Sequence, residues 1–181
     1  MSVMDVIIHP FEGIGSNLLE ALRVAVAQRF GVNVLLGEEQ AVPARAYSPQ
    51  HQQYHSTKLL ETLTAHKHND KQTRLGVTAV DLYVPKLNFV FGEASSAERV
   101  AVFSIARLDP RFYGEPQDDA ILKRRAITEA VHELGHVFGL GHCRKQECVM
   151  WFSNTLVETD RKRSEFCPQC ARKIGLLTSG R

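Results

Sequence analysis

The pattern of apolar and polar residues predicts alternating strands and helices over the first half of the chain. Apolar runs bounded by turn residues predict strands, at residues 3–9, 32–36, 75–84, 88–93 and 99–108. Apolar residues at helical spacing predict helices, at residues 16–30 and 52–66. Ser16 or Asn17 is expected to cap the first helix, and Gly31 to end it. This order favours an α/β fold, a mixed twisted sheet with packed helices, whose last two strands form a hairpin at one edge.

A longer helix is expected from about Ala120 to Phe138. Asp118 and Asp119 precede it, and acidic side chains there cap free N–H groups and suit the positive end of the helix dipole. One apolar stripe predicts the face that meets the core, formed by Ile127, Val131, Leu134 and Phe138. Beyond the helix the chain becomes polar and loses its periodicity, so something other than an apolar core must hold residues 143–170.

Length and composition exclude several classes of protein. At 181 residues, 44% hydrophobic and 23% charged, the chain predicts one globular domain over residues 1–181 rather than a disordered protein. Its parts would be a sheet-and-helix part, 1–139, and a C-terminal part, 140–181. A net charge of +2 does not suggest a nucleic-acid binder, and no apolar run is long enough to span a membrane. The first residues lack the basic region of a signal peptide, so we expect a cytoplasmic protein. We also expect it to be a monomer.

Residues 132–142 read His-Glu-x-x-His-x-x-Gly-x-x-His and carry the strongest candidate chemistry. His132 and His136 are four residues apart, so both imidazoles project from one face of a helix and can bind one zinc ion. Gly139 lets the chain break sharply out of the helix, which brings His142 back as a third ligand. Three protein ligands leave a fourth position for water, as at a catalytic zinc.

Glu133 supplies the remaining part of a hydrolytic site. It lies beside His132, where it can reach the water without binding the metal. As general base it would take the proton while water attacks a carbonyl, and as general acid it would deliver that proton to the leaving amine. The alternative interpretation is a helix with solvent-facing histidines. His51 and His55 are also four apart, but no glutamate follows His51, so we expect surface or partly packed histidines there.

The cysteines form a second candidate metal site. All four lie near the C-terminus in two closely spaced pairs, Cys143 with Cys148 and Cys167 with Cys170. This spacing fits a closed zinc site of four thiolates, which would organise a segment too polar to fold alone. Disulfides in an extracellular protein are the alternative, but cysteines without a signal peptide indicate a reducing compartment. The sequence therefore predicts two zinc ions, one catalytic and one structural.

The extended histidine motif, followed by Cys-x4-Cys-x-Met and a later Cys-x2-Cys, resembles the archaemetzincins, a branch of the metzincin metallopeptidases. The match covers residues 132–170 closely, and the strand and helix order upstream is compatible with the metzincin fold. The resemblance implies that Met150 forms an apolar floor beneath the histidines, the Met-turn. By its residue type alone, Met150 is equally an ordinary core methionine.

The resemblance also implies that an edge strand binds peptide by strand addition, for which residues 88–93 are the candidate. A plain hairpin explains this segment equally well. Some metzincins carry a tyrosine two residues after the Met-turn methionine, where it assists at the metal. This chain has Phe152 there, so no tyrosine ligand is expected from that position.

The leading hypothesis is a zinc metallopeptidase that acts on a peptide or protein substrate. One alternative is a metal-loaded peptide-binding protein with little turnover, whose sequence would look the same. Another is a nucleic-acid-binding module built on the cysteine knuckle and the basic triplets at residues 123–125 and 161–163. That alternative leaves the histidine triad without a purpose, and solvated helix and loop faces explain the triplets better.

Overall fold

The computed structural model describes residues 5–65 and 72–175 and contains two sheets. The main sheet has the order β2-β1-β5-β8-β7, formed by β1 (Asp5–Pro10), β2 (Asn33–Leu36), β5 (Gln72–Thr78), β7 (Gly92–Ser95) and β8 (Val100–Ser104). Its strands pair in parallel except β7, which runs antiparallel to β8 at the edge. A small sheet has the order β3-β4-β6, formed by β3 (Tyr47–Ser48), β4 (Gln53–His55) and β6 (Leu82–Tyr83). The predicted mixed sheet is confirmed.

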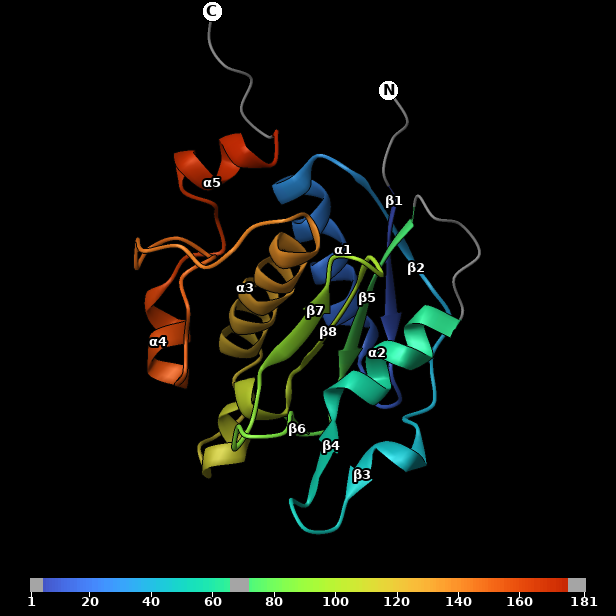
Figure 1. The fold of residues 1–181 in the computed structure, drawn as a ribbon. Helices are drawn as coiled ribbons and strands as arrows, with labels where there is room; N and C mark the ends of the chain where they lie inside the picture. Colours follow the sequence, from blue (N-terminus) through green and yellow to red (C-terminus); the bar gives the residue numbers. More distant parts are fainter. Residues whose placement is uncertain (1–4, 66–71, 176–181) are drawn as a thin grey trace, which may run out of the picture.

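Helices cover both faces of the main sheet (Figure 1). The helices are α1 (Ser16–Phe30), α2 (Ser56–Ala65), α3 (Asp119–Val137), α4 (Leu156–Arg161) and α5 (Pro168–Lys173), with short 3-10 turns at Ala44–Ala46, Ala106–Leu108 and Pro110–Tyr113. Alternate residues of β8 face opposite layers, because successive side chains of a strand point to opposite sides. Ala101 and Phe103 pack in the core under α1 and α3, whereas Val100 and Val102 pack under α2.

Several predicted boundaries are wrong for identifiable reasons. The helix expected over 52–66 begins only at Ser56, because residues 53–55 pair with β3 and β6 as a strand; its expected last residue lies outside the described part of the chain. The strand expected at 88–93 is mostly loop, and β7 starts at Gly92. The strand expected at 75–84 divides into β5 and β6. Gly15, rather than Ser16 or Asn17, is the N-cap of α1.

The long helix α3 follows its prediction closely. Asp118 is the N-cap, and its carboxylate accepts a hydrogen bond from the Ile121 amide at 2.9 Å. The helix packs against α1, β7 and β8 (Figure 1), so its C-terminal half lies beside the edge of the main sheet. Every helix in the described ranges is too short or too polar to cross a lipid bilayer.

Candidate active site

Three histidines meet at the C-terminal end of α3. His132 and His136 lie one turn apart, with ring centroids 4.6 Å apart. Gly139 ends the helix with φ of +92°, a left-handed conformation that glycine adopts without strain. The chain then turns back, which places the ring of His142 at 4.8 Å from that of His136. Candidate ligand atoms of the three side chains all lie within 4.8 Å of one another.

Backbone carbonyls orient two of these rings. The Nδ1 atom of His132 lies 2.7 Å from the Val149 carbonyl oxygen, and that of His136 lies 2.8 Å from the Leu140 carbonyl oxygen. Because a carbonyl oxygen only accepts, each Nδ1 carries the proton and each Nε2 keeps a free lone pair. The two Nε2 atoms face each other at 3.1 Å. Two facing lone pairs repel unless a cation lies between them, so this donor set fits a metal ion.

Desolvation favours the neutral form of these imidazoles, which is the form that binds metals. Burial lowers the pKa of His132 well below its ordinary value, and the charge of Lys162 lowers it further. Desolvation likewise lowers the pKa of His136, which is half-buried, and that of His142, which is exposed but partly desolvated by its neighbours.

Glu133 is enclosed between α3 and the edge of the main sheet. Its side chain approaches Gly92 of β7 so closely that a Cβ atom on Gly92 would lie 2.7 Å from the Glu133 carboxylate. Burial raises the pKa of Glu133 well above its ordinary value, and the neighbouring carboxylate of Glu129 raises it further. A carboxyl group with a raised pKa is suited to taking up and releasing a proton near neutral pH.

Met150 lies fully buried against the same helix. Its thioether fills the space over Gly135, where any added Cβ atom would collide with it. The Cys143 amide donates to the Met150 carbonyl at 2.8 Å, and the preceding residue, Val149, supplies the carbonyl that holds His132. Met150 is therefore a core methionine that also lies in the turn bracing His132. Phe152 contacts the ring of His142 at 4.7 Å between centroids.

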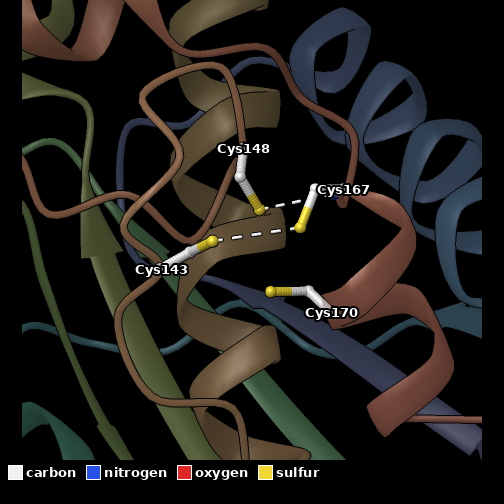
Figure 2. Close-up of side chains that lie close together, drawn as sticks. All are labelled: Cys143, Cys148, Cys167 and Cys170. Atoms are coloured by element: carbon white, nitrogen blue, oxygen red, sulfur yellow. Dashed lines mark hydrogen bonds between the residues drawn. The ribbon is translucent and has the colours of Figure 1, made fainter.

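The four cysteines form a separate cluster beside α3 (Figure 2). The Sγ atoms of Cys143 and Cys167 are 3.9 Å apart, too far for a disulfide bond of about 2.05 Å. A zinc ion bound at about 2.3 Å in tetrahedral geometry would hold two thiolates about 3.8 Å apart. Burial opposes ionisation of Cys167, but hydrogen bonds from the Cys170 backbone and the neighbouring thiols lower its pKa to about 7. The cluster fits a closed metal site.

A buried ion pair lies beside the histidines, and the sequence pattern did not indicate it. Lys162 belongs to a basic triplet interpreted above as a solvated face, yet its side chain is only 1% exposed. Its ammonium lies 3.0 Å from the carboxylate of Glu129, one helical turn before Glu133. Arg125, in the other triplet, is also buried and pairs with Asp160 at 2.8 Å. The interpretation as solvated faces holds for the exposed residues of the triplets, Lys123, Arg124, Arg161 and Arg163. It is wrong for Arg125 and Lys162, because their burial depends on where α4 packs, which local pattern does not encode.

Comparisons with known proteins place the chain in a known peptidase family. The family model described as Peptidase family M54 matches residues 10–175. The archaemetzincin of Methanocaldococcus jannaschii is 39% identical over 172 residues, covering 95% of this chain and 93% of that protein. The solved archaemetzincin of Methanopyrus kandleri superposes with a TM-score of 0.84 at 38% identity, covering 96% of this chain and 94% of that one. A zinc-dependent peptidase from Methanocorpusculum labreanum superposes with a TM-score of 0.87 at 29% identity, covering 94% and 100%.

The fold and the comparisons together define a zinc metallopeptidase. The chain belongs to peptidase family M54, the archaemetzincins, as the resemblance of its motifs predicted.

Proposed function

We propose that His132, His136 and His142 hold the catalytic zinc of this peptidase. The observation that carries the proposal is the pair of facing Nε2 atoms at 3.1 Å, each freed for a metal by an Nδ1 hydrogen bond to a carbonyl. The cysteine cluster would hold a second, structural zinc through Cys143, Cys148, Cys167 and Cys170. Such a site would fasten α5 to the turn that braces His132, so it would also support the catalytic site.

Glu133 is the proton carrier in this proposal. When bound, zinc supplies a Lewis acid that polarises the scissile carbonyl and lowers the pKa of water. The Glu133 carboxylate takes a proton from the water whose oxygen bonds to the carbonyl carbon. It then gives that proton to the amide nitrogen, so the C–N bond breaks and the amine leaves neutral. The close approach of Gly92 excludes bulk water from one side of this carboxylate.

The substrate in this proposal is a peptide or protein segment that pairs with β7 along the edge that has no strand partner within residues 5–65 and 72–175. Support comes from the position of β7, the edge strand of the main sheet, directly beside Glu133. We further propose a single domain over residues 1–181, in parts 1–139 and 140–181, that acts as a cytoplasmic monomer without nucleic-acid or membrane partners. Size-exclusion chromatography with light scattering tests the oligomeric state.

Cleavage of a diverse peptide mixture, read by mass spectrometry, tests the catalytic assignment. The zinc-loaded protein and its Glu133→Ala variant are compared, and bound zinc is measured in both. The variant is expected to keep its zinc and lose hydrolysis by orders of magnitude, because it lacks the carboxylate that accepts the proton. Unchanged hydrolysis in Glu133→Ala would refute the role given to Glu133. Loss of zinc from that variant would contradict its assignment as a residue that does not bind the metal.

A further inference from the structure

A cavity of about 310 Å³ opens directly beside His132 and Glu133. One wall is the loop and strand start at residues 87–92, and the other is the segment at residues 152–154. Its apolar rim includes Leu87 and Phe152, which are 54% and 48% exposed. The cavity therefore lies where one side chain of a substrate held along β7 would enter, next to the groups assigned to the reaction.

The buried pair of Lys162 and Glu129 also lines this cavity. The side chains of the two residues are 1% and 3% exposed, and Thr159 on α4 fixes the pair by donating to Glu129 at 3.4 Å. A lysine ammonium has three N–H donors, and in the described part of the chain Glu129 is its one ion-pair partner. The cavity lining therefore carries both a strong donor and a strong acceptor.

Ser153 adds a second donor and acceptor to the cavity. Its Oγ atom is buried and has no hydrogen-bond partner among residues 5–65 and 72–175. A buried hydroxyl without a hydrogen-bond partner is energetically unfavourable, so it calls for a group that binds it. An occupant that hydrogen-bonds to Ser153 would remove this cost.

The charges of the lining select among the possible side chains. An acidic side chain would bring a third carboxylate beside Glu129 and Glu133. A basic one would place a second cation beside Lys162, whose ammonium already pairs with Glu129. An apolar side chain would exclude water from the ion pair without replacing its hydrogen bonds. A carboxamide is neutral and both donates and accepts, so it matches the whole lining. The apolar rim suits a methylene stem above it.

We propose that this cavity is a specificity subsite for a carboxamide side chain, glutamine above all, next to the scissile bond. Lys162 and Ser153 donate to the amide oxygen, and Glu129 accepts from the amide nitrogen. This inference rests on the proposed function, because it assigns the cavity to a peptide substrate of the same site.

The test uses the zinc-loaded protein and a peptide library, with cleaved sites read by mass spectrometry. A matched set of peptides then carries Gln, Met, Glu or Lys at the position where the library shows selectivity. Methionine is the control because it has nearly the shape of glutamine without its amide. We expect one position within about two residues of the scissile bond to favour Gln by about tenfold or more in kcat/KM over each of the others. Equal rates for Gln and Met, or a preference for Glu or Lys, would overturn the subsite.

Two variants assign the preference to named residues. Ser153→Ala should reduce the ratio of kcat/KM for Gln over Met by about twofold to tenfold, as expected for one lost hydrogen bond. Ser96→Ala, an exposed serine in the turn after β7, is the matched control and should keep the ratio. The double variant Lys162→Met with Glu129→Gln removes both charges together, so neither is left unpaired, and should shift the preference toward Met. An unchanged ratio in both variants would contradict the proposal.

Absence of cleavage in every peptide would be a failure of the proposed function, distinct from a failure of the subsite. The same peptides would then be compared by calorimetric binding to the zinc-loaded protein. Tighter binding of the Gln peptide than of the Met peptide supports the subsite, and equal binding overturns it.

Discussion

Substitution of Gly135 by alanine tests the packing that braces α3, the helix that carries the proposed zinc ligands His132 and His136. Gly135 lies on α3 between His132 and His136, and a Cβ atom there would collide with the Met150 thioether. The next nearest side chain, Phe166, would lie 3.3 Å away, a contact that a small movement relieves. Met150 and Gly135 thus form one close contact, so their substitutions should have non-additive effects on the free energy of unfolding.

The magnitude follows from two opposing effects. Overpacking a close core contact costs about 1–3 kcal/mol, while replacing glycine by alanine inside a helix returns about 1 kcal/mol. Gly135→Ala should therefore lower the free energy of unfolding by up to about 2 kcal/mol. In a Met150→Ala background the collision is gone, so the same change should be neutral or stabilising by up to about 1 kcal/mol. The expected coupling free energy, the difference between the effects of Gly135→Ala in the two backgrounds, is about 1–3 kcal/mol.

Urea unfolding in excess zinc, followed by circular dichroism, measures this coupling across the parent protein, the two single variants and the double variant. Gly15→Ala is the matched control, since nothing lies within 4 Å of an added Cβ atom there and Gly15 has a negative φ of −70°. The control substitution should change the free energy of unfolding equally in the parent protein and in the Met150→Ala background. A coupling below about 0.5 kcal/mol between positions 135 and 150 would refute the argument, because independent sites add within that limit.

Two further predictions concern the C-terminal part. Cys167→Ser should remove one zinc ion per chain, measured by elemental analysis, while the histidine site keeps its own; retention of all zinc would contradict the four-thiolate assignment. Burial favours the neutral form of Asp160, but Arg125 and Arg124 together lower its pKa below the ordinary value. Its ion pair therefore adds stability at neutral pH that is lost as pH falls through and below about 4. Asp160→Asn should lower the free energy of unfolding by about 2 kcal/mol at pH 7, and the difference from the parent should shrink toward pH 3; a difference independent of pH would exclude this origin.

Local pattern was sufficient for the elements whose stability comes from their own residues. Asp118 caps α3 as predicted, and the apolar stripe of this helix faces the core with the helical spacing that the sequence shows. Residues 53–55 behaved differently, because pairing with β3 and β6 overrode their helical spacing. The strand β6 lies far along the chain, so local pattern cannot indicate this pairing.

The sequence by itself determined that three histidines and a glutamate would meet, since helix geometry places residues 132 and 136 on one face and Gly139 returns the chain toward His142. It likewise determined that the cysteines come in two pairs. Only the tertiary structure decided that Val149 orients His132, that Met150 fills the space over Gly135, and that Lys162 is buried against Glu129. These contacts join residues far apart in the chain, as the 17 positions between His132 and Val149 illustrate. These contacts form because of the way α3, α4 and the following turns pack together. That packing depends on burial of the whole core, which no local repeat in the sequence encodes.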